Sequence, residues 1–244
     1  MKEYSVLNKF FLMDGGMVHG VLSSSVHFAK AADWYAPLLP QKDIRLAGPI
    51  LFATERFKGK APGIASDVTR LANSFPHRLH LSEIDTELTF EAMAAHLSAF
   101  VYFGDSVGQT HGLRIADCRV LAYLPHILRP AHWDAMTAPV AAWRINDRMG
   151  RERALPLRPA RKDPIADVRP LRLSDEEIDA LMDAGEADAL LMRMGKEPGE
   201  VNLKEIQGCY DIAKGCIDRW KAGGGRARDI LMDMAEKDFG KTKK

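Results

Sequence analysis

Short runs of apolar residues, separated by turn residues, recur through the first 150 positions of the chain. The runs with the length of strands are residues 6–13, 50–53, 97–103, 109–115 and 140–145. The third and fourth of these flank the turn sequence Asp105-Ser-Val-Gly108, and two apolar runs around such a turn predict a β-hairpin. The chain is therefore expected to contain a sheet with at least one antiparallel pair.

Apolar residues at helical spacing alternate with these runs. They predict helices over residues 66–75, with Ser66 as its cap, and over residues 89–97. A further stripe follows Asp117 and consists of Val120, Leu121, Leu124, Ile127 and Leu128. Helices that alternate with strands are typical of an α/β or α+β fold. We predict such a lobe over residues 1–150, with a mixed sheet.

The pattern changes between residues 144 and 172, where nine positions are Arg or Lys. Prolines interrupt this stretch at positions 156, 159, 164 and 170. Because proline disfavours regular structure, we expect residues 151–172 to form an extended connector. A basic arm for nucleic acid is the alternative, since phosphate contacts need Lys or Arg. The aromatic residues that would stack on bases are absent between Trp143 and Tyr210.

Residues 173–244 have the pattern of a small helical lobe. Ser174-Asp-Glu-Glu177 is a capping box, and it predicts a helix start. We expect one helix after it, a second over residues 186–194 that ends at Gly195, and two more towards the end of the chain. The apolar side chains proposed to contact a partner, or else to form the helical core, are Leu181, Met182, Leu190, Leu191 and Met194.

Composition and charge narrow the class of protein. The chain of 244 residues is 46% hydrophobic and 27% charged, as in ordinary globular proteins. Its net charge of +1 gives no strong field towards nucleic acid or membranes. Three cysteines without a Cys-x-x-Cys pair indicate neither a disulfide framework nor a zinc site. No signal-peptide pattern or membrane-length apolar run is present, so we expect a cytoplasmic protein.

Two arginines flank the acidic residue at the centre of the chain, in Arg114-Ile-Ala-Asp117-Cys-Arg119. Asp117 is a good helix N-cap, and guanidinium groups bind carboxylates through paired hydrogen bonds. We therefore predict a structural clamp of Arg114, Asp117 and Arg119 that joins a strand end to a helix start. A catalytic Asp or an anion site is the alternative, because both kinds of network look alike in sequence.

Five motifs together carry a family resemblance. They are Phe11-Leu-Met-Asp14-Gly15, Gly48-Pro49-Ile-Leu51, His96-Leu97, Arg114-x-x-Asp117-x-Arg119-Val120-Leu121 and the strand around Trp143. In this order they resemble the effector chaperones, or adaptors, of the bacterial type VI secretion system. That family usually has Asp-Pro-Arg where this chain has Asp117-Cys118-Arg119. The resemblance implies a non-catalytic cytoplasmic protein that binds a secreted effector, helps load it onto the VgrG spike protein, and needs no cofactor.

An enzyme remains the main alternative. His77-x-x-His80 has a spacing that could chelate a metal, and His111 and Asp117 could complete a hydrolase site. The sequence contains no His-Glu-x-x-His motif and no Gly-x-Ser-x-Gly elbow. Cys118 lies beside Arg119 at a helix start, where the pKa of a thiol can be lowered. We expect no metal site, and we expect no partner among nucleic acids or membranes.

Overall fold

A computed structural model describes residues 7–28, 30, 32–57, 62–157, 169–225 and 228–241. The chain divides into two compact units, Met1–Leu181 and Met182–Lys244. The predicted boundaries were a connector over residues 151–172 and a helical lobe from residue 173, whereas this division falls inside a helix. Residues 158–168 of the predicted connector lie outside the described part of the chain.

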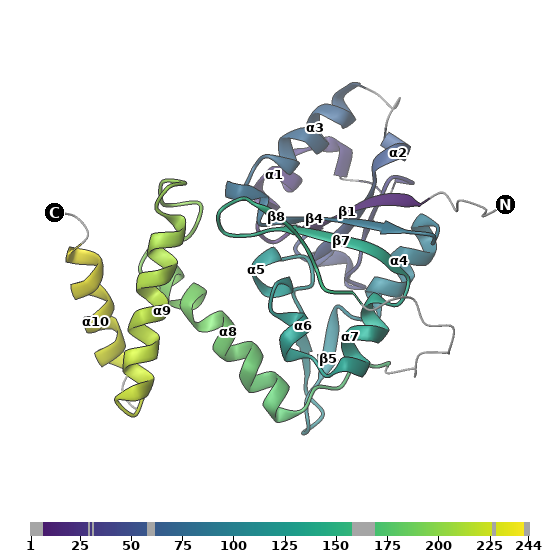
Figure 1. The fold of residues 1–244 in the computed structure, drawn as a ribbon. Coiled ribbons are helices and arrows are strands. Elements are labelled where there is room, and N and C mark those ends of the chain that lie inside the picture. Colours follow the sequence, from purple (N-terminus) through teal and green to yellow (C-terminus); the bar gives the residue numbers. More distant parts are fainter. Residues whose placement is uncertain are drawn as a thin grey trace. The chain divides into compact units, whose positions relative to one another are not determined.

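The first unit is built on a six-stranded sheet of order β2-β3-β1-β4-β7-β8 (Figure 1). Its strands are β1 (Asn8–Asp14), β2 (Tyr35–Pro37), β3 (Pro49–Ala53), β4 (Leu81–Thr86), β7 (Val140–Asn146) and β8 (Glu152–Ala154). All pairs in this sheet are antiparallel, so the predicted fold class is confirmed, with antiparallel in place of mixed pairing. The strand β8 lies within the predicted connector, where no regular structure was expected.

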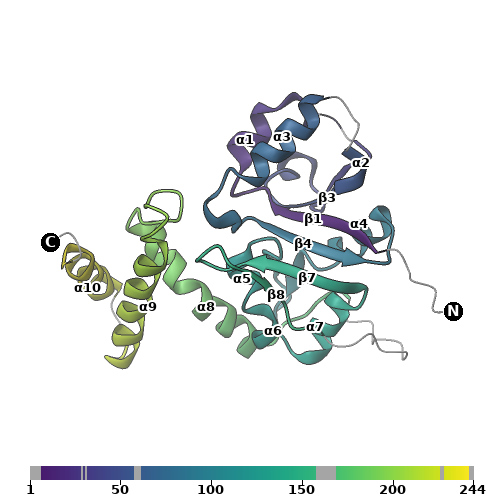
Figure 2. The same cartoon turned by 45° about the horizontal axis from the view of Figure 1, so that its top comes forward.

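Helices cover the two faces of the sheet unequally (Figure 2). One face carries α1 (His19–Ser24) and α3 (Pro62–Ala72) over β1 and β3, with α2 (Thr54–Phe57) after β3. The other carries α4 (Phe90–Ser98), α5 (Cys118–Leu121), α6 (Leu124–Ile127) and α7 (Pro130–Thr137). The helix predicted from Ser66 thus begins earlier, at Pro62, and the stripe after Asp117 forms two short helices.

Alternation along β1 divides the apolar core into two layers. Phe10 and Leu12 pack with the helices α4–α7, while Met13 packs with the α1 and α3 side. Successive side chains of a strand point to opposite faces, so one strand serves both layers. The strand β1 is therefore central to the unit in both sequence pattern and packing.

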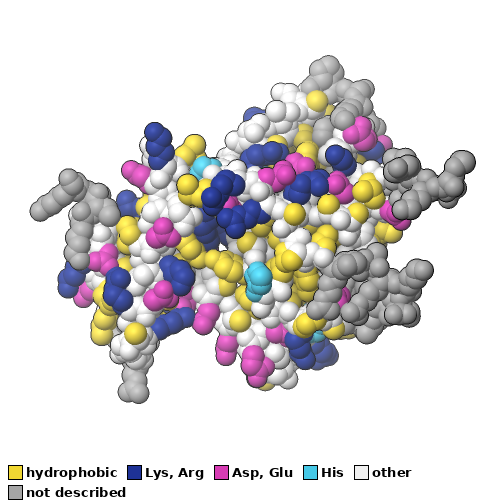
Figure 3. All heavy atoms as spheres, in the orientation of Figure 1, with side chains coloured by type: hydrophobic (Ala, Val, Ile, Leu, Met, Phe, Trp, Pro, Cys, Tyr) yellow, Lys and Arg dark blue, Asp and Glu magenta, His cyan; other side chains and the backbone are white. Residues whose placement is uncertain are grey.

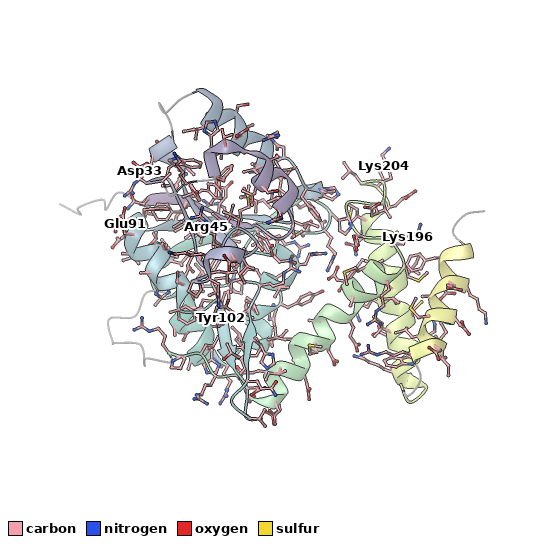
Figure 4. All side chains as sticks on the ribbon, turned by 180° about the vertical axis from the view of Figure 1, so that it is seen from behind. Asp33, Arg45, Glu91, Tyr102, Lys196 and Lys204 are labelled. Atoms are coloured by element: carbon pink, nitrogen blue, oxygen red, sulfur yellow. The ribbon has the colours of Figure 1, made fainter. Side chains whose placement is uncertain are left out.

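The predicted hairpin forms a separate two-stranded sheet of β5 (Tyr102–Gly104) and β6 (Thr110–Gly112). In its turn, Asp105 Oδ1 accepts from the N–H groups of Val107 and Gln109 at 3.1 and 2.7 Å. The hydroxyl of Tyr102, labelled in Figure 4, donates to Gln41 Oε1 at 2.8 Å. The prediction of an antiparallel hairpin is confirmed.

The second unit consists of the C-terminal part of α8 (Asp175–Arg193), together with α9 (Ile206–Ala222) and α10 (Arg228–Lys241). The helix α8 is continuous, so the two helices predicted over this stretch are one. It ends at Arg193, and Gly195 caps it as predicted, with a φ of +58°, while Lys196 N donates to Leu191 O at 2.9 Å. The apolar core of the unit includes Leu190, Leu191, Tyr210, Ala213, Cys216 and Ile217.

Candidate functional site

The three residues of the predicted clamp lie together, and a fourth residue joins them. Arg119 binds Asp117 through two parallel hydrogen bonds, Nε to Oδ1 at 3.0 Å and Nη2 to Oδ2 at 2.8 Å. Arg114 Nη2 lies 3.3 Å from Asp117 Oδ2 and donates to Asp14 Oδ2 at 2.8 Å. Asp14 was not predicted as a partner. The sequence signal that could have indicated Asp14 is its position at the end of the first strand motif.

Three separate segments meet at this network because close backbone contacts hold them there. Asp14 N donates to His80 O at 2.8 Å, and Gly15 N donates to Gly48 O at 2.9 Å. A Cβ on Gly15 would lie 2.1 Å from Leu46 O, so only glycine fits. Cys118 N donates to Leu79 O at 2.9 Å, which fixes the start of α5 beside β4. The motifs at residues 14–15, 48–49 and 114–119 thus converge in space.

The electrostatics of the network favour the ionised form of Asp117. The side chain of Asp117 is 1% exposed, and burial alone would raise its pKa. Hydrogen bonds and charge from Arg119, with the charge of Arg114, outweigh burial and hold the pKa of Asp117 below its usual range. Asp117 also caps α5, since its side chain accepts from Arg119 N at 3.0 Å. A carboxylate in this state is a poor proton acceptor, and its geometry is that of a clamp.

Cys118 differs from the expectation of a reactive thiol. It is 1% exposed and lies in the apolar core. Burial raises the pKa of the Cys118 thiol to about 12 and outweighs the opposing effect of the Arg119 charge. The thiol donates to Leu81 O at 3.2 Å. A neutral, buried thiol is a packing group rather than a nucleophile.

The residues of the hydrolase alternative each have other partners. His80 is fully buried with its Nε2 2.7 Å from Leu71 O, and burial lowers its pKa. His111 Nε2 lies 2.9 Å from Asp105 Oδ2, and Asp117 is bound by arginines. His77 lies in the turn before β4 with φ +52°. Among the residues that the structure describes, no group of three or more His, Cys, Asp or Glu side chains could hold a metal.

The five candidates for partner contact lie in different environments. Leu190 and Leu191 are each 2% exposed in the core of the second unit, which corrects their assignment to a contact surface. Leu181 packs against the core of the first unit, and Met194 is half-buried. Met182 is 68% exposed, so it alone of the five presents most of its side chain to solvent.

A second buried carboxylate fixes the start of α8. Glu177 closes the predicted capping box, because Ser174 N donates to its Oε2 at 2.9 Å. Its carboxylate also accepts from Arg129 N at 2.7 Å and lies 2.9 Å from His132 Nδ1. Burial opposes ionisation, but hydrogen bonds from the Arg129 and Ser174 N–H groups and from His132 lower the pKa of Glu177 to about 2. The sequence predicted the cap, and it missed the partners on α7.

No described helix is both long and apolar enough to cross a membrane. Comparisons of the chain with protein-family models, with curated proteins and with solved structures find no match.

Proposed function

We propose that this chain is a non-catalytic cytoplasmic chaperone or adaptor, which binds a type VI secretion effector and helps load it onto the VgrG spike. The convergence of the resemblance motifs supports the proposal. Asp14 and Arg114 are 100 positions apart in the sequence, yet they bind each other in the fold. Because the motifs around Asp14 and Arg114 form one hydrogen-bonded network, their joint occurrence in the sequence has a structural reason.

The state of the acidic residues favours an adaptor over a hydrolase. A general base must offer a carboxylate or imidazole to a substrate proton. The carboxylate of Asp117 instead accepts from Arg119 on both oxygens and is almost completely buried. In the proposed role, this network holds the end of β1 and the start of α5 in place for a protein-binding surface.

Three arginines of the basic stretch argue against the nucleic-acid alternative. Arg144 binds Asp85 through two hydrogen bonds of 2.8 and 2.9 Å. Arg151 and Arg153 each lie 2.9 Å from Asp147 Oδ2. Phosphate binding would have to compete with these carboxylates, which reduces the positive field of the stretch.

The test is co-expression of the tagged chain with the effector and the VgrG protein encoded near its gene. We expect the effector to co-purify with the chain and to be recovered with VgrG only when the chain is present. A tagged protein of similar size and charge serves as the control for adsorption. If the chain retains neither protein, or if the effector binds VgrG equally without it, the proposal fails.

A further inference from the structure

The sheet face that α3 covers only in part contains a groove of about 510 Å³. Its floor is formed by β1, β4 and β7, and α3 forms one wall. Figure 3 shows positive and negative side chains intermixed over these strands. The lining residues that matter here are Lys9, Phe11, Thr69, Arg78, Glu83 and Arg144. The volume lies within the range of sites that bind small ligands or short chain segments.

Arg78 differs from the other arginine of this groove. Arg144 is engaged by Asp85 through both of its terminal nitrogens. The Nε of Arg78 is buried, and no residue in the described part of the chain accepts a hydrogen bond from it. Arg78 also lines a smaller hollow beside Glu83 and Arg144. A guanidinium with unused donors is unfavourable in a partly buried position, so the part of Arg78 that lines the groove marks a place where a ligand acceptor would fit.

The backbone holds Arg78 in this position despite strain. His77 and Arg78 are the described non-glycine residues with positive φ, +52° and +53°. Residues other than glycine adopt this region at a cost, and such strain concentrates at functional sites. The turn is braced by the β7–β8 hairpin, since a Cβ on Gly150 would lie 2.5 Å from His77 Nδ1. Arg78 N also donates to Phe75 O at 3.1 Å.

We propose that this groove binds an extended peptide segment of a partner protein, which places an acidic side chain against Arg78 and an apolar side chain against Phe11. The inference rests on the proposed function in one respect, namely that the partner protein is the effector. The carboxylate would accept from the terminal nitrogens of the Arg78 guanidinium, which lines the groove. Phe11 lines the groove and is half-buried, so it offers apolar surface there, and its paired residue on β4 is Glu83.

The spacing and charge of the floor favour an extended segment over a helix. Lys9 and Phe11 on β1, like Glu83 and Asp85 on β4, are two residues apart and share a face. Residues on the same face of an extended chain recur every ~6.6–6.8 Å. The alternate side chains of a peptide that lies along the strands would therefore have the same spacing as the side chains of the floor. A docked amphipathic helix needs an apolar groove, whereas this floor contains Lys9, Glu83, Asp85 and Arg144.

The experiment selects displayed random short peptides on the intact chain and measures their affinities by fluorescence anisotropy. We expect the selected peptides to contain an acidic residue beside an apolar one. Arg78→Gln should weaken their binding about tenfold, the effect of losing one partly exposed charged hydrogen bond. Its matched control is Arg70→Gln on α3, where Arg70 pairs with Asp67 at 3.1 Å outside the groove.

A second pair of variants tests the groove without changing charge. Thr69→Trp places a bulky side chain in the groove, whereas Ser66→Trp places the same side chain on an exposed part of α3 outside it. We expect only Thr69→Trp to abolish peptide binding, with circular dichroism confirming that both variants fold. The inference is wrong if no peptide is selected, or if peptides bind Arg78→Gln and Thr69→Trp as well as they bind the controls.

The two proposals can fail separately. If groove-dependent peptides are selected but the effector does not co-purify, the groove stands and the adaptor proposal falls. If the effector co-purifies equally with Thr69→Trp and with the unaltered chain, the adaptor proposal stands and the groove is not its binding site.

Discussion

Replacing Asp117 with Asn separates the two ways in which this carboxylate stabilises the fold, the ion pairs with arginine and the cap on α5. Asn is as good a helix N-cap as Asp, so the cap on α5 is kept while the negative charge is lost. Arg119, whose side chain is 13% exposed, then has only a neutral acceptor. Arg114 is affected less, because its side chain is 52% exposed and keeps Asp14 as a partner. Asp117→Ala removes the charge and the cap together.

The expected magnitudes follow from this geometry. Removing one partner of a fully buried ion pair costs about 3–5 kcal/mol. Because Arg114 keeps a partner and contact with water, we expect Asp117→Asn to cost about 2–3 kcal/mol. Asp117→Ala should cost about 1 kcal/mol more through loss of the cap. For a unit of this size, Asp117→Asn corresponds to a Tm lower by about 5–10 °C.

Urea unfolding followed by tryptophan fluorescence measures both changes. Trp220 lies in the second unit, so a Trp220→Phe background leaves Trp34, Trp133 and Trp143 to report on the first. Asp14→Asn is the control, since Asp14 is buried like Asp117, at 5% exposed, but its arginine partner Arg114 is half-exposed. A loss below about 0.5 kcal/mol for Asp117→Asn would show that the buried ion pair does not stabilise the fold. Equal losses for Asn and Ala would refute the role of the cap.

Three further predictions concern other parts of the chain. Glu177→Gln should cost about 3 kcal/mol near neutral pH, because a folded pKa of about 2 against an ordinary 4.5 stabilises the fold above pH 4.5. This difference from the unaltered chain should vanish as the pH falls from 4.5 to 2 in urea titrations; a constant difference would contradict the pKa assignment. Gly15→Ala should lower stability by about 3 kcal/mol in thermal unfolding, since its Cβ would lie 2.1 Å from Leu46 O, and an unchanged Tm would refute that contact. Leu190→Ala should cost about 3 kcal/mol in chemical unfolding and Met182→Ala less than about 0.5 kcal/mol; equal effects would contradict their different burial.

Local sequence patterns predicted the parts of this structure that depend on neighbouring residues. The cap at Asp117, the capping box at Ser174 and the helix end at Gly195 each form as expected. The pairing of Asp117 with Arg119 is also local, because the two residues are two positions apart in the sequence. In each case a few consecutive residues contain both the donor and the acceptor, so the pattern alone specifies the bond.

The features that sequence reasoning missed depend on distant residues. Asp14 meets Arg114 because the end of β1 and the start of α5 both bind the segment just before β4. Asp14 N donates to His80 O, and Cys118 N donates to Leu79 O. Nothing near either residue indicates the other. Apart from the hairpin, the hydrophobic pattern predicted strands without their partners, so it could not show that the whole six-stranded sheet is antiparallel. The strained turn at His77 and Arg78 has no glycine to signal it, and packing against Gly150 holds it.

The position of β1 has a consequence for synthesis on the ribosome. It lies between β3 and β4, although it is the first strand of the described chain. Residues are added at about 5–20 per second, so a nascent chain holds Asp14 for on the order of ten seconds before Arg114 is made. The core around Phe10 and Leu12 is incomplete during that interval, because α5, α6, α7 and β7 all follow residue 114. A polypeptide proposed to escort another protein would itself need protection from aggregation while it is being translated.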